Sequence, residues 1–199
     1  MKLKINPKSP EKEKINTVIR YLKEGKISLY PTDTVYGIGA DIFNFEAVKK
    51  VYEIKRRPLD KPLSVCVSKI DDINQIANLN KDMEKKLENI FPGPFTVILK
   101  KKKIVPSILT SGSEKIGIRI PDSKICMELS KEFPITTTSA NISGEPMAES
   151  LGEVFEQFGD EIDLILDAGI CTHGVHSTVI DMTFSPPKII RKGAKTPSI

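Results

Sequence analysis

The sequence predicts an α/β protein with a twisted, mixed parallel and antiparallel sheet and flanking helices. Short β-rich segments alternate with amphipathic helical segments through most of the chain. Strand-like segments then cluster near 162–167, 177–183 and 188–191, which is not the pattern of a purely parallel sheet. The 199 residues contain no internal repeat and no long Pro/Gly/Ser linker, so we expect one domain over residues 1–199.

Each expected element has a local reason. The first helix follows Ser9-Pro10-Glu11, which supplies a capping hydroxyl, a proline for the first turn and an acid for the positive end of the helix dipole, and Gly25 ends it. The second follows Asn44 and ends before Pro58, because a proline pushes the preceding residue out of helical geometry. The others are strands at 27–30 and 63–67, helices at 69–77 and 81–91 started by Ser68 and Asn80, strands at 95–99 and 116–120, a helix opened by 121–122, a strand at 134–138, a helix at 148–158 and the three late strands.

Composition limits the class of protein and of partner. Lys and Arg outnumber Asp and Glu by 30 to 26, and the resulting net charge of +4 permits anionic ligands without indicating nucleic acid. No apolar run reaches the roughly 18 residues of a membrane span, and residues 1–8 are too charged for a signal peptide. Cys66, Cys126 and Cys171 are odd in number and far apart, which favours reduced thiols. We therefore expect a cytoplasmic protein with no membrane partner.

Several common catalytic signatures are missing from the sequence. It contains no phosphate-binding G-x-x-x-x-G-K-[ST] loop and no G-x-S-x-G elbow, and Gly37-Ile38-Gly39 lacks the third glycine of a dinucleotide fingerprint. Cys171, His173 and His176 could be three metal ligands, but no fourth ligand pairs naturally with them. Two loop histidines are the simpler interpretation, so we expect no metal held by the protein itself.

Two segments carry more polar or glycine residues than a scaffold requires. Residues 30–41 have hydroxyls at Thr32, Thr34 and Tyr36; if the segment is extended, these share one face, although an ordinary strand-to-helix loop is the alternative. In residues 136–144, strand alternation points Thr137, Ser139 and Asn141 the same way. A hydroxyl ladder that faces water at a sheet edge is the alternative for this second segment.

A third segment is basic and stiffened by proline. Residues 55–63 read Lys-Arg-Arg-Pro-Leu-Asp-Lys-Pro-Leu, and Pro58 forces Arg57 into extended geometry just past a helix end. The side chains of Lys55 and Arg57 can then converge. The lysine ammonium supplies a point charge and the arginine guanidinium a planar pair of donors, a combination that suits an oligophosphate. A solvated cationic helix end that complements its own dipole is the alternative.

Seven motifs in order resemble one known family. They are Pro31-Thr32-Asp33-Thr34-Val35-Tyr36-Gly37, Lys55-x-Arg57-Pro58, Phe91-Pro92-Gly93-Pro94-Phe95-Thr96, Ile118-Arg119-Ile120-Pro121, Ser139-Ala140-Asn141, Ser177-Thr178-Val179-Ile180-Asp181 and Arg191-x-Gly193. From about Ile15 to Gly193 the chain resembles the YrdC/Sua5 family, the threonylcarbamoyl-AMP synthases of tRNA t6A biosynthesis. It resembles the short, single-domain YrdC type, since the sequence stops soon after Gly193.

The resemblance implies a YrdC-like fold with a large, concave, basic cavity. It implies condensation of L-threonine, bicarbonate and ATP into L-threonylcarbamoyl-AMP with release of pyrophosphate. ATP would bring Mg2+ as its cofactor ion, and no covalent enzyme nucleophile is needed. The product would go to a downstream transferase complex that modifies adenosine 37 of tRNA.

The resemblance also implies roles for individual residues, carried over by position. The catalytic residues would be Lys55, Arg57, Ser139 and Asn141. ATP would be bound by Lys55, Arg57, Lys61, Ser139, Asn141, Met147 and Arg191. Threonine would be bound by Thr32, Cys66, Arg119, Thr137 and Ser177. Two positions depart from the family pattern, because relatives often carry Asn or His at Lys61 and some carry His at Cys66.

Two other functions remain open at the level of sequence. One is the carbamoyl-adenylate chemistry of the YrdC-like module in hydrogenase maturation proteins, which are much longer chains. The other is a double-stranded RNA-binding module without catalysis, because a basic concave surface can grip RNA, including tRNA, by shape and phosphate. The Lys100–Lys103 run would serve such a surface, although a solvated strand end is its simpler interpretation.

Overall fold

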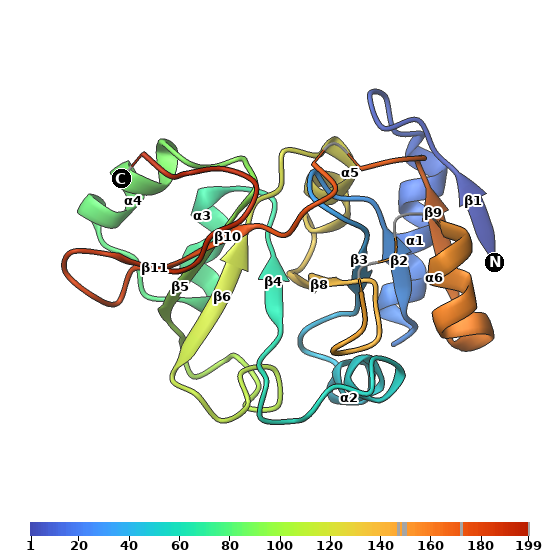
Figure 1. Ribbon diagram of the computed structural model, residues 1–199, viewed down its shortest axis with the longest axis horizontal. Coiled ribbons are helices and arrows are strands. Elements are labelled where there is room, and N and C mark those ends of the chain that lie inside the picture. The colour runs from blue at the N-terminus through green and yellow to red at the C-terminus, as the bar shows by residue number, and fades with distance from the viewer. Residues whose placement is uncertain (147, 149–150, 172, 199) are drawn as a thin grey trace.

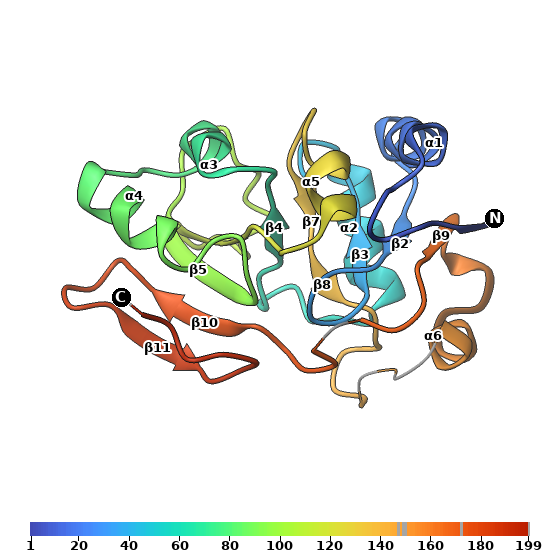
Figure 2. The same cartoon turned by 90° about the horizontal axis from the view of Figure 1, so that it is seen from above.

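Two mixed β-sheets lie next to each other, with helices packed against them (Figures 1 and 2). The computed structural model describes residues 1–146, 148, 151–171 and 173–198. The five-stranded sheet has the order β1-β9-β2-β3-β8, and the six-stranded sheet has the order β11-β10-β5-β6-β4-β7. The first sheet combines residues from both ends of the chain, because β1 pairs in parallel with β9.

The elements have the following bounds. The strands are β1 Lys2–Lys4, β2 Ser28–Tyr30, β3 Gly37–Gly39, β4 Ser64–Cys66, β5 Phe95–Lys100, β6 Lys115–Arg119, β7 Ile135–Thr136, β8 Thr138–Ser139, β9 Leu164–Asp167, β10 Thr178–Asp181 and β11 Lys188–Arg191. The helices are α1 Lys12–Lys23, α2 Phe45–Ile54, α3 Ile70–Ile76, α4 Lys81–Glu88, α5 Lys124–Leu129 and α6 Leu151–Phe158, followed by a 3-10 turn at Gly159–Glu161.

The five-stranded sheet is apolar on both faces. Tyr30, Leu164 and Leu166 pack in one core cluster with helices α1 and α5. The alternate residues Leu29 and Ile165 turn to the other face and join a second cluster that contains apolar residues of α2 and α6. Period-two alternation therefore explains how strands β2 and β9 are covered from both sides.

The six-stranded sheet is apolar on only one face. Val65, Val97, Ile118 and Ile180 are buried in the core cluster that includes α3 and α4. The intervening residues of β4, β5, β6 and β10 include Ser64, Thr96, Lys115, Gly117 and Arg119 as well as the apolar Ile98 and Val179, and these residues line a cavity. Burying one face on helices leaves the opposite face of this sheet free to form a binding surface.

The two sheets are joined by one continuous segment, residues 135–139. Strand β7 pairs with β4 in the six-stranded sheet, and β8 pairs with β3 in the five-stranded sheet. Thr137 lies between the two strands, and its backbone N–H donates to the carbonyl of Ser64 at 2.8 Å. We refer to residues 135–139 as the seam.

The predicted fold class is confirmed, with differences in detail. The chain forms two mixed sheets where one was expected, and the strand expected at 134–138 is interrupted at Thr137, which separates β7 from β8. Strands β1 and β3 were not expected. Asn44 and Asn80 cap their helices as predicted, but Ser9 and Ser68 do not: the capping positions are Glu11 and Lys69. In the described part of the chain no helix is long and apolar enough to cross a membrane.

Candidate functional site

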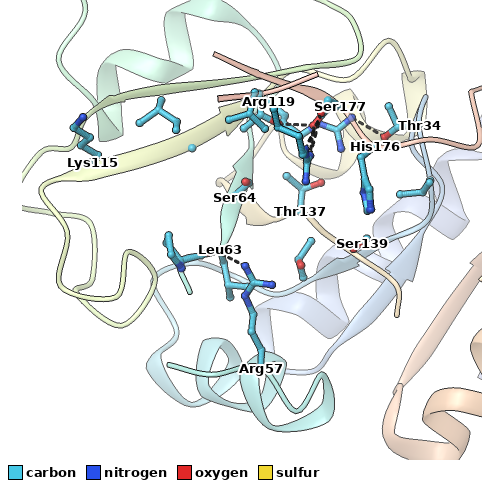
Figure 3. A pocket seen from close by; sticks show the side chains of 18 of the residues that line it. Thr34, Arg57, Leu63, Ser64, Lys115, Arg119, Thr137, Ser139, His176 and Ser177 are labelled. Carbon is cyan, nitrogen blue, oxygen red and sulfur yellow. Dashed lines mark hydrogen bonds between the residues drawn. The ribbon is translucent and has the colours of Figure 1, made fainter. Parts of the chain in front are cut away.

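A cavity of about 370 Å³ lies over the open face of the six-stranded sheet. Its floor follows from strand alternation and register: Gly117 of β6 pairs with Ser64 of β4 on one side and with Ile98 of β5 on the other. Thr96 and Val179, a register pair of β5 and β10, extend the floor. The walls come from residues 34–35, Arg57, the seam, residues 176–177 and Arg191 (Figure 3).

Small side chains at the centre of the floor leave the backbone of β6 accessible from the cavity. A Cβ atom at Gly117 would meet Ser64 Oγ at 3.0 Å and Thr96 Cγ2 at 3.3 Å. Because glycine carries no side chain, a ligand can approach the backbone of β6 closely at this point. The floor also offers hydroxyls, since Thr96 Oγ1 and Ser177 Oγ lie 2.7 Å apart in a hydrogen bond.

Four cationic side chains line this cavity: Arg57, Lys115, Arg119 and Arg191. Lys115 and Arg119 come from alternate positions of β6, so both face the same way. Figure 3 shows Arg57 and Arg119 on opposite sides of the cavity, with Lys115 at one end. The described lining contains no carboxylate. Outside this lining, Asp33 pairs with Arg119 at 2.9 Å and Asp181 pairs with Lys115 at 2.8 Å. Within the described chain Arg57 and Arg191 have no carboxylate partner, so the cavity keeps an excess of positive charge that suits an anionic ligand.

Arg119 is the most constrained of these cations. One guanidinium nitrogen, Nη2, donates to Asp33 Oδ1 at 2.9 Å and to Thr34 Oγ1 at 2.8 Å, and the Arg119 and Asp33 side chains are only 8% and 3% exposed. Nε is buried without a hydrogen-bond partner among the described residues. An unpartnered buried donor costs free energy, so this guanidinium is prepared for an acceptor from inside the cavity.

Arg191 and Ser177 are held by the C-terminal segment. Arg191 donates from Nη2 to the Ser177 carbonyl at 3.0 Å, and burial together with Arg119 lowers the pKa of Arg191. Gly193 N–H donates to Thr178 Oγ1 at 2.9 Å. A Cβ at Gly193 would overlap the backbone of His176 and Ser177. Only glycine allows the chain to pass this close to the cavity wall.

His176 also lines the cavity, and its ring extends toward Ser139 in Figure 3. Burial lowers the pKa of His176, and the positive charges of Arg191, Arg119 and Lys55 lower it further. Imidazole is therefore the neutral species at pH 7. Within the described chain no three His, Cys, Asp or Glu side chains are grouped as a metal site.

The family model for Sua5, YciO and YrdC proteins, described as telomere recombination, matches residues 20–193. The chain belongs to the Sua5/YciO/YrdC family. This membership confirms the resemblance that the seven motifs indicated.

Individual relatives of this family member are similar over most of its length. The threonylcarbamoyl-AMP synthase of Pyrococcus abyssi is 38% identical over 186 residues, which cover 92% of this chain and 55% of that protein. The putative threonylcarbamoyl-AMP synthase of Methanocaldococcus jannaschii is 42% identical over 185 residues, covering 91% and 88%. A crystal structure of P. abyssi Sua5 complexed with L-threonine matches with a TM-score of 0.92 and 36% identity, covering 97% of this chain and 57% of that one. The chain thus spans little more than half of the P. abyssi relative.

In this Sua5/YciO/YrdC chain the structure brings six of the sequence-predicted site residues to one cavity. They are Arg57, Arg119, Thr137, Ser139, Ser177 and Arg191. Thr34, Lys115 and His176 line the same cavity. From sequence Thr34 was noted only as a hydroxyl and His176 only as a possible metal ligand or loop histidine, and Lys115 was missed. Alternation along β6 is a signal that would have found Lys115 four residues before Arg119. Met147, predicted to bind ATP, lies outside the described residues.

Four other predicted residues lie off the cavity wall, which corrects their expected placement. Cys66 shares a face of β4 with Ser64, but it is fully buried in the core cluster with α1 and α5, where its Sγ lies 3.7 Å from Ser130 Oγ. Thr32 is buried and donates to the Val35 carbonyl at 2.7 Å. Asn141 accepts a hydrogen bond from Ser139 Oγ at 2.6 Å and so helps to fix the end of the seam. Lys61 is exposed, and its carbonyl accepts from Arg57 Nε at 2.9 Å.

Lys55 is the largest departure from expectation. Its side chain is 1% exposed, and Nζ donates to the carbonyls of Ser139 at 2.5 Å and Asn141 at 2.6 Å. It therefore ties the end of α2 to the seam instead of pointing into the cavity beside Arg57. Burial lowers the pKa of Lys55 to about 7, and repulsion from Arg57 adds to this effect.

This lowered pKa predicts how stability depends on pH. The unfolded chain holds the Lys55 ammonium at an ordinary pKa of about 10.4, so between pH 7 and 10 the unfolded state binds the extra proton. Stability should therefore rise with pH in this window, by up to about 1.4 kcal/mol per pH unit. Urea unfolding at pH 7.5 and 9.5 should show the gain in the native chain and lose it in Lys55→Met. An equal gain in both proteins would contradict the lowered pKa of Lys55.

Proposed function

We propose that this chain is a threonylcarbamoyl-AMP synthase, which condenses L-threonine, bicarbonate and ATP into L-threonylcarbamoyl-AMP and pyrophosphate. The observation that carries the proposal is the buried Arg119, whose Nε has no acceptor among the described residues, in a cavity whose described lining includes three more cations. Two relatives that cover most of the chain bear this name, one of them as a putative enzyme, and a 36% identical structure holds L-threonine.

The amino acid would bind at the Arg119 end of the cavity. A guanidinium fork matches the planar carboxylate of threonine, and the neighbouring Thr34 and Asp33 fix its orientation. Thr137 Oγ1 is buried and has no hydrogen-bond partner within the described chain. We assign this hydroxyl and Ser177 Oγ to the polar groups of threonine, because both belong to cavity-lining residues.

The triphosphate of ATP would bind across the cavity, between Arg57, Arg191 and Ser139. The described lining offers no carboxylate for a metal ion. ATP would therefore enter as its Mg2+ complex, with the ion held by phosphate oxygens. Of the residues assigned to ATP from sequence, Lys55 and Asn141 would act by holding the seam in place.

The chemistry needs positioning and charge neutralisation more than a nucleophilic side chain. The threonine amine combines with bicarbonate to give a carbamate and water. A carbamate oxygen then attacks the α-phosphorus of ATP, forming a P–O bond while the bond to the β-phosphate oxygen breaks and pyrophosphate leaves. Arg57, Arg191 and Lys115 would neutralise the charge that develops on pyrophosphate. We further propose that the enzyme acts in the cytoplasm and passes its product to a separate tRNA-modifying transferase.

The decisive test measures pyrophosphate release by the purified chain with Mg2+. We expect release only when L-threonine, bicarbonate and ATP are all present, with loss of signal when any one is omitted. L-serine in place of L-threonine serves as a control for recognition of the side chain. Release that does not depend on threonine or on bicarbonate would reject the proposed reaction.

A further inference from the structure

The described lining of the cavity contains five titratable side chains, and only one of them can accept a proton near pH 7. Arg57, Lys115, Arg119 and Arg191 are cations that only donate hydrogen bonds. His176 is the fifth, and in its neutral form it has a nitrogen that can accept a proton. The described cavity wall holds no Asp, Glu, Cys or Tyr side chain that could do the same.

The backbone holds His176 firmly while leaving its ring free. Its carbonyl accepts from Ala194 N–H at 3.0 Å, and two residues earlier Gly174 N–H donates to the Thr34 carbonyl at 2.9 Å. The imidazole itself makes no hydrogen bond to any residue that the structure describes, and it extends into the cavity (Figure 3). Both ring nitrogens are therefore available to a ligand.

The charged groups of the described chain that shift the pKa of this ring are all cations. Arg191 belongs to β11, Arg119 belongs to β6 and Lys55 follows α2, and together with burial they lower the pKa of His176. The Asp33 carboxylate accepts from Arg119 Nη2 and from the N–H of Asp122. The ring is thus kept in its basic, unprotonated form in a cavity built for anions.

The proposed reaction has a step that these cations cannot perform. Threonine enters with a protonated amine, which has no lone pair to attack bicarbonate. Resting on the proposed function, we propose that His176 is the general base that takes this proton from the threonine ammonium group inside the cavity.

The step balances in atoms and charge. His176 removes one proton from the ammonium and becomes imidazolium. The free amine forms a C–N bond to bicarbonate, and the C–O bond to the hydroxyl breaks; the hydroxyl leaves as water with the second amine proton. The carbamate keeps one N–H, and imidazolium returns its proton to solvent. One threonine zwitterion and one bicarbonate thus give one threonine carbamate, which is a dianion, one water and one released proton.

The test compares the native chain with His176→Gln and His176→Asn in pyrophosphate release from pH 6 to 9.5, with all three substrates saturating. His173→Gln is the matched control, because His173 belongs to the same loop but is not among the cavity-lining residues. At pH 7 we expect kcat to fall by about 100-fold or more in both His176 variants, the range for a lost general base. The deficit should shrink as pH rises, because solvent then deprotonates the threonine amine. Threonine affinity, measured by calorimetry, should change less than about threefold.

The native rate should fall on the acid side, below the ordinary imidazole pKa of about 6.5. Native-like kcat in either folded His176 variant would overturn the assignment. So would a deficit that is constant at every pH or that lies wholly in the threonine KM, since both indicate a contact role. If the native chain itself releases no pyrophosphate, the proposed function fails instead, and the two failures are distinguishable.

Discussion

Arg119→Lys is expected to raise the threonine KM by about 100-fold while the ATP KM changes little. Lysine keeps the positive charge but offers a single donor centre, so it cannot satisfy Asp33, Thr34 and a substrate carboxylate together. A 100-fold effect corresponds to about 2.7 kcal/mol, within the range for disturbing a buried, hydrogen-bonded charge pair. Initial rates of pyrophosphate release with threonine and ATP varied in turn give both constants.

The matched control for this variant is Arg20→Lys, because Arg20 is exposed on helix α1. It should leave both constants unchanged. Equal increases in the two KM values after Arg119→Lys would remove Arg119 from the threonine subsite. Urea unfolding of the same proteins separates a lost contact from a general loss of the native state.

Gly193→Ala is expected to lower kcat/KM for ATP by at least about tenfold, with a smaller effect on stability. The added Cβ would overlap the backbone of His176 and Ser177, so the C-terminal segment must move away from the cavity wall. Arg191, two residues earlier, would then lose its contacts with the Ser177 carbonyl. Overpacking of this kind costs about 1–3 kcal/mol, which a segment near the chain end can relieve by shifting.

Gly159→Ala is the control, because it should lower stability without changing ATP kinetics. Gly159 has a φ of +53° and open space around its Cβ position, so alanine there is strained without touching the cavity. We expect thermal unfolding to register a loss of stability with no change in the ATP KM. A Gly193→Ala protein with native ATP kinetics would contradict the proposed link between the C-terminal segment and the cavity.

Short motifs and local patterns in the sequence were sufficient to predict much of the fold, and half of the site residues they predicted line the cavity. Helix caps at Asn44 and Asn80 depend on residues three positions apart, and strand alternation depends on neighbours in the chain. Arg57 could be singled out from its place beside Pro58, whereas Arg119 and Arg191 were assigned because their short motifs resemble those of a known family. Such features do not require knowledge of which distant segments meet.

The remaining features depend on contacts between distant segments. Strand β1 exists because residues 2–4 pair with residues 165–167 at the other end of the chain. Strand β3 consists of two glycines around Ile38, a poor strand sequence by propensity. Its glycines are needed because the Tyr30 ring packs against it: a Cβ at Gly39 would lie 2.8 Å from Tyr30 Cε1. The burial of Lys55 likewise depends on two carbonyls more than 80 residues away.

The seam connects the two sheets covalently at the place where substrates would bind, so neither sheet can move there without the other. Thr137 and Ser139 line the cavity, while β7 and β8 on either side belong to different sheets. Arg119 of one sheet already donates to Thr34 Oγ1, which precedes β3 of the other sheet, at 2.8 Å. The two sheets are therefore tied together at the cavity before any substrate binds. A shift of one sheet relative to the other would move the groups proposed to bind threonine and those proposed to bind ATP out of register with each other.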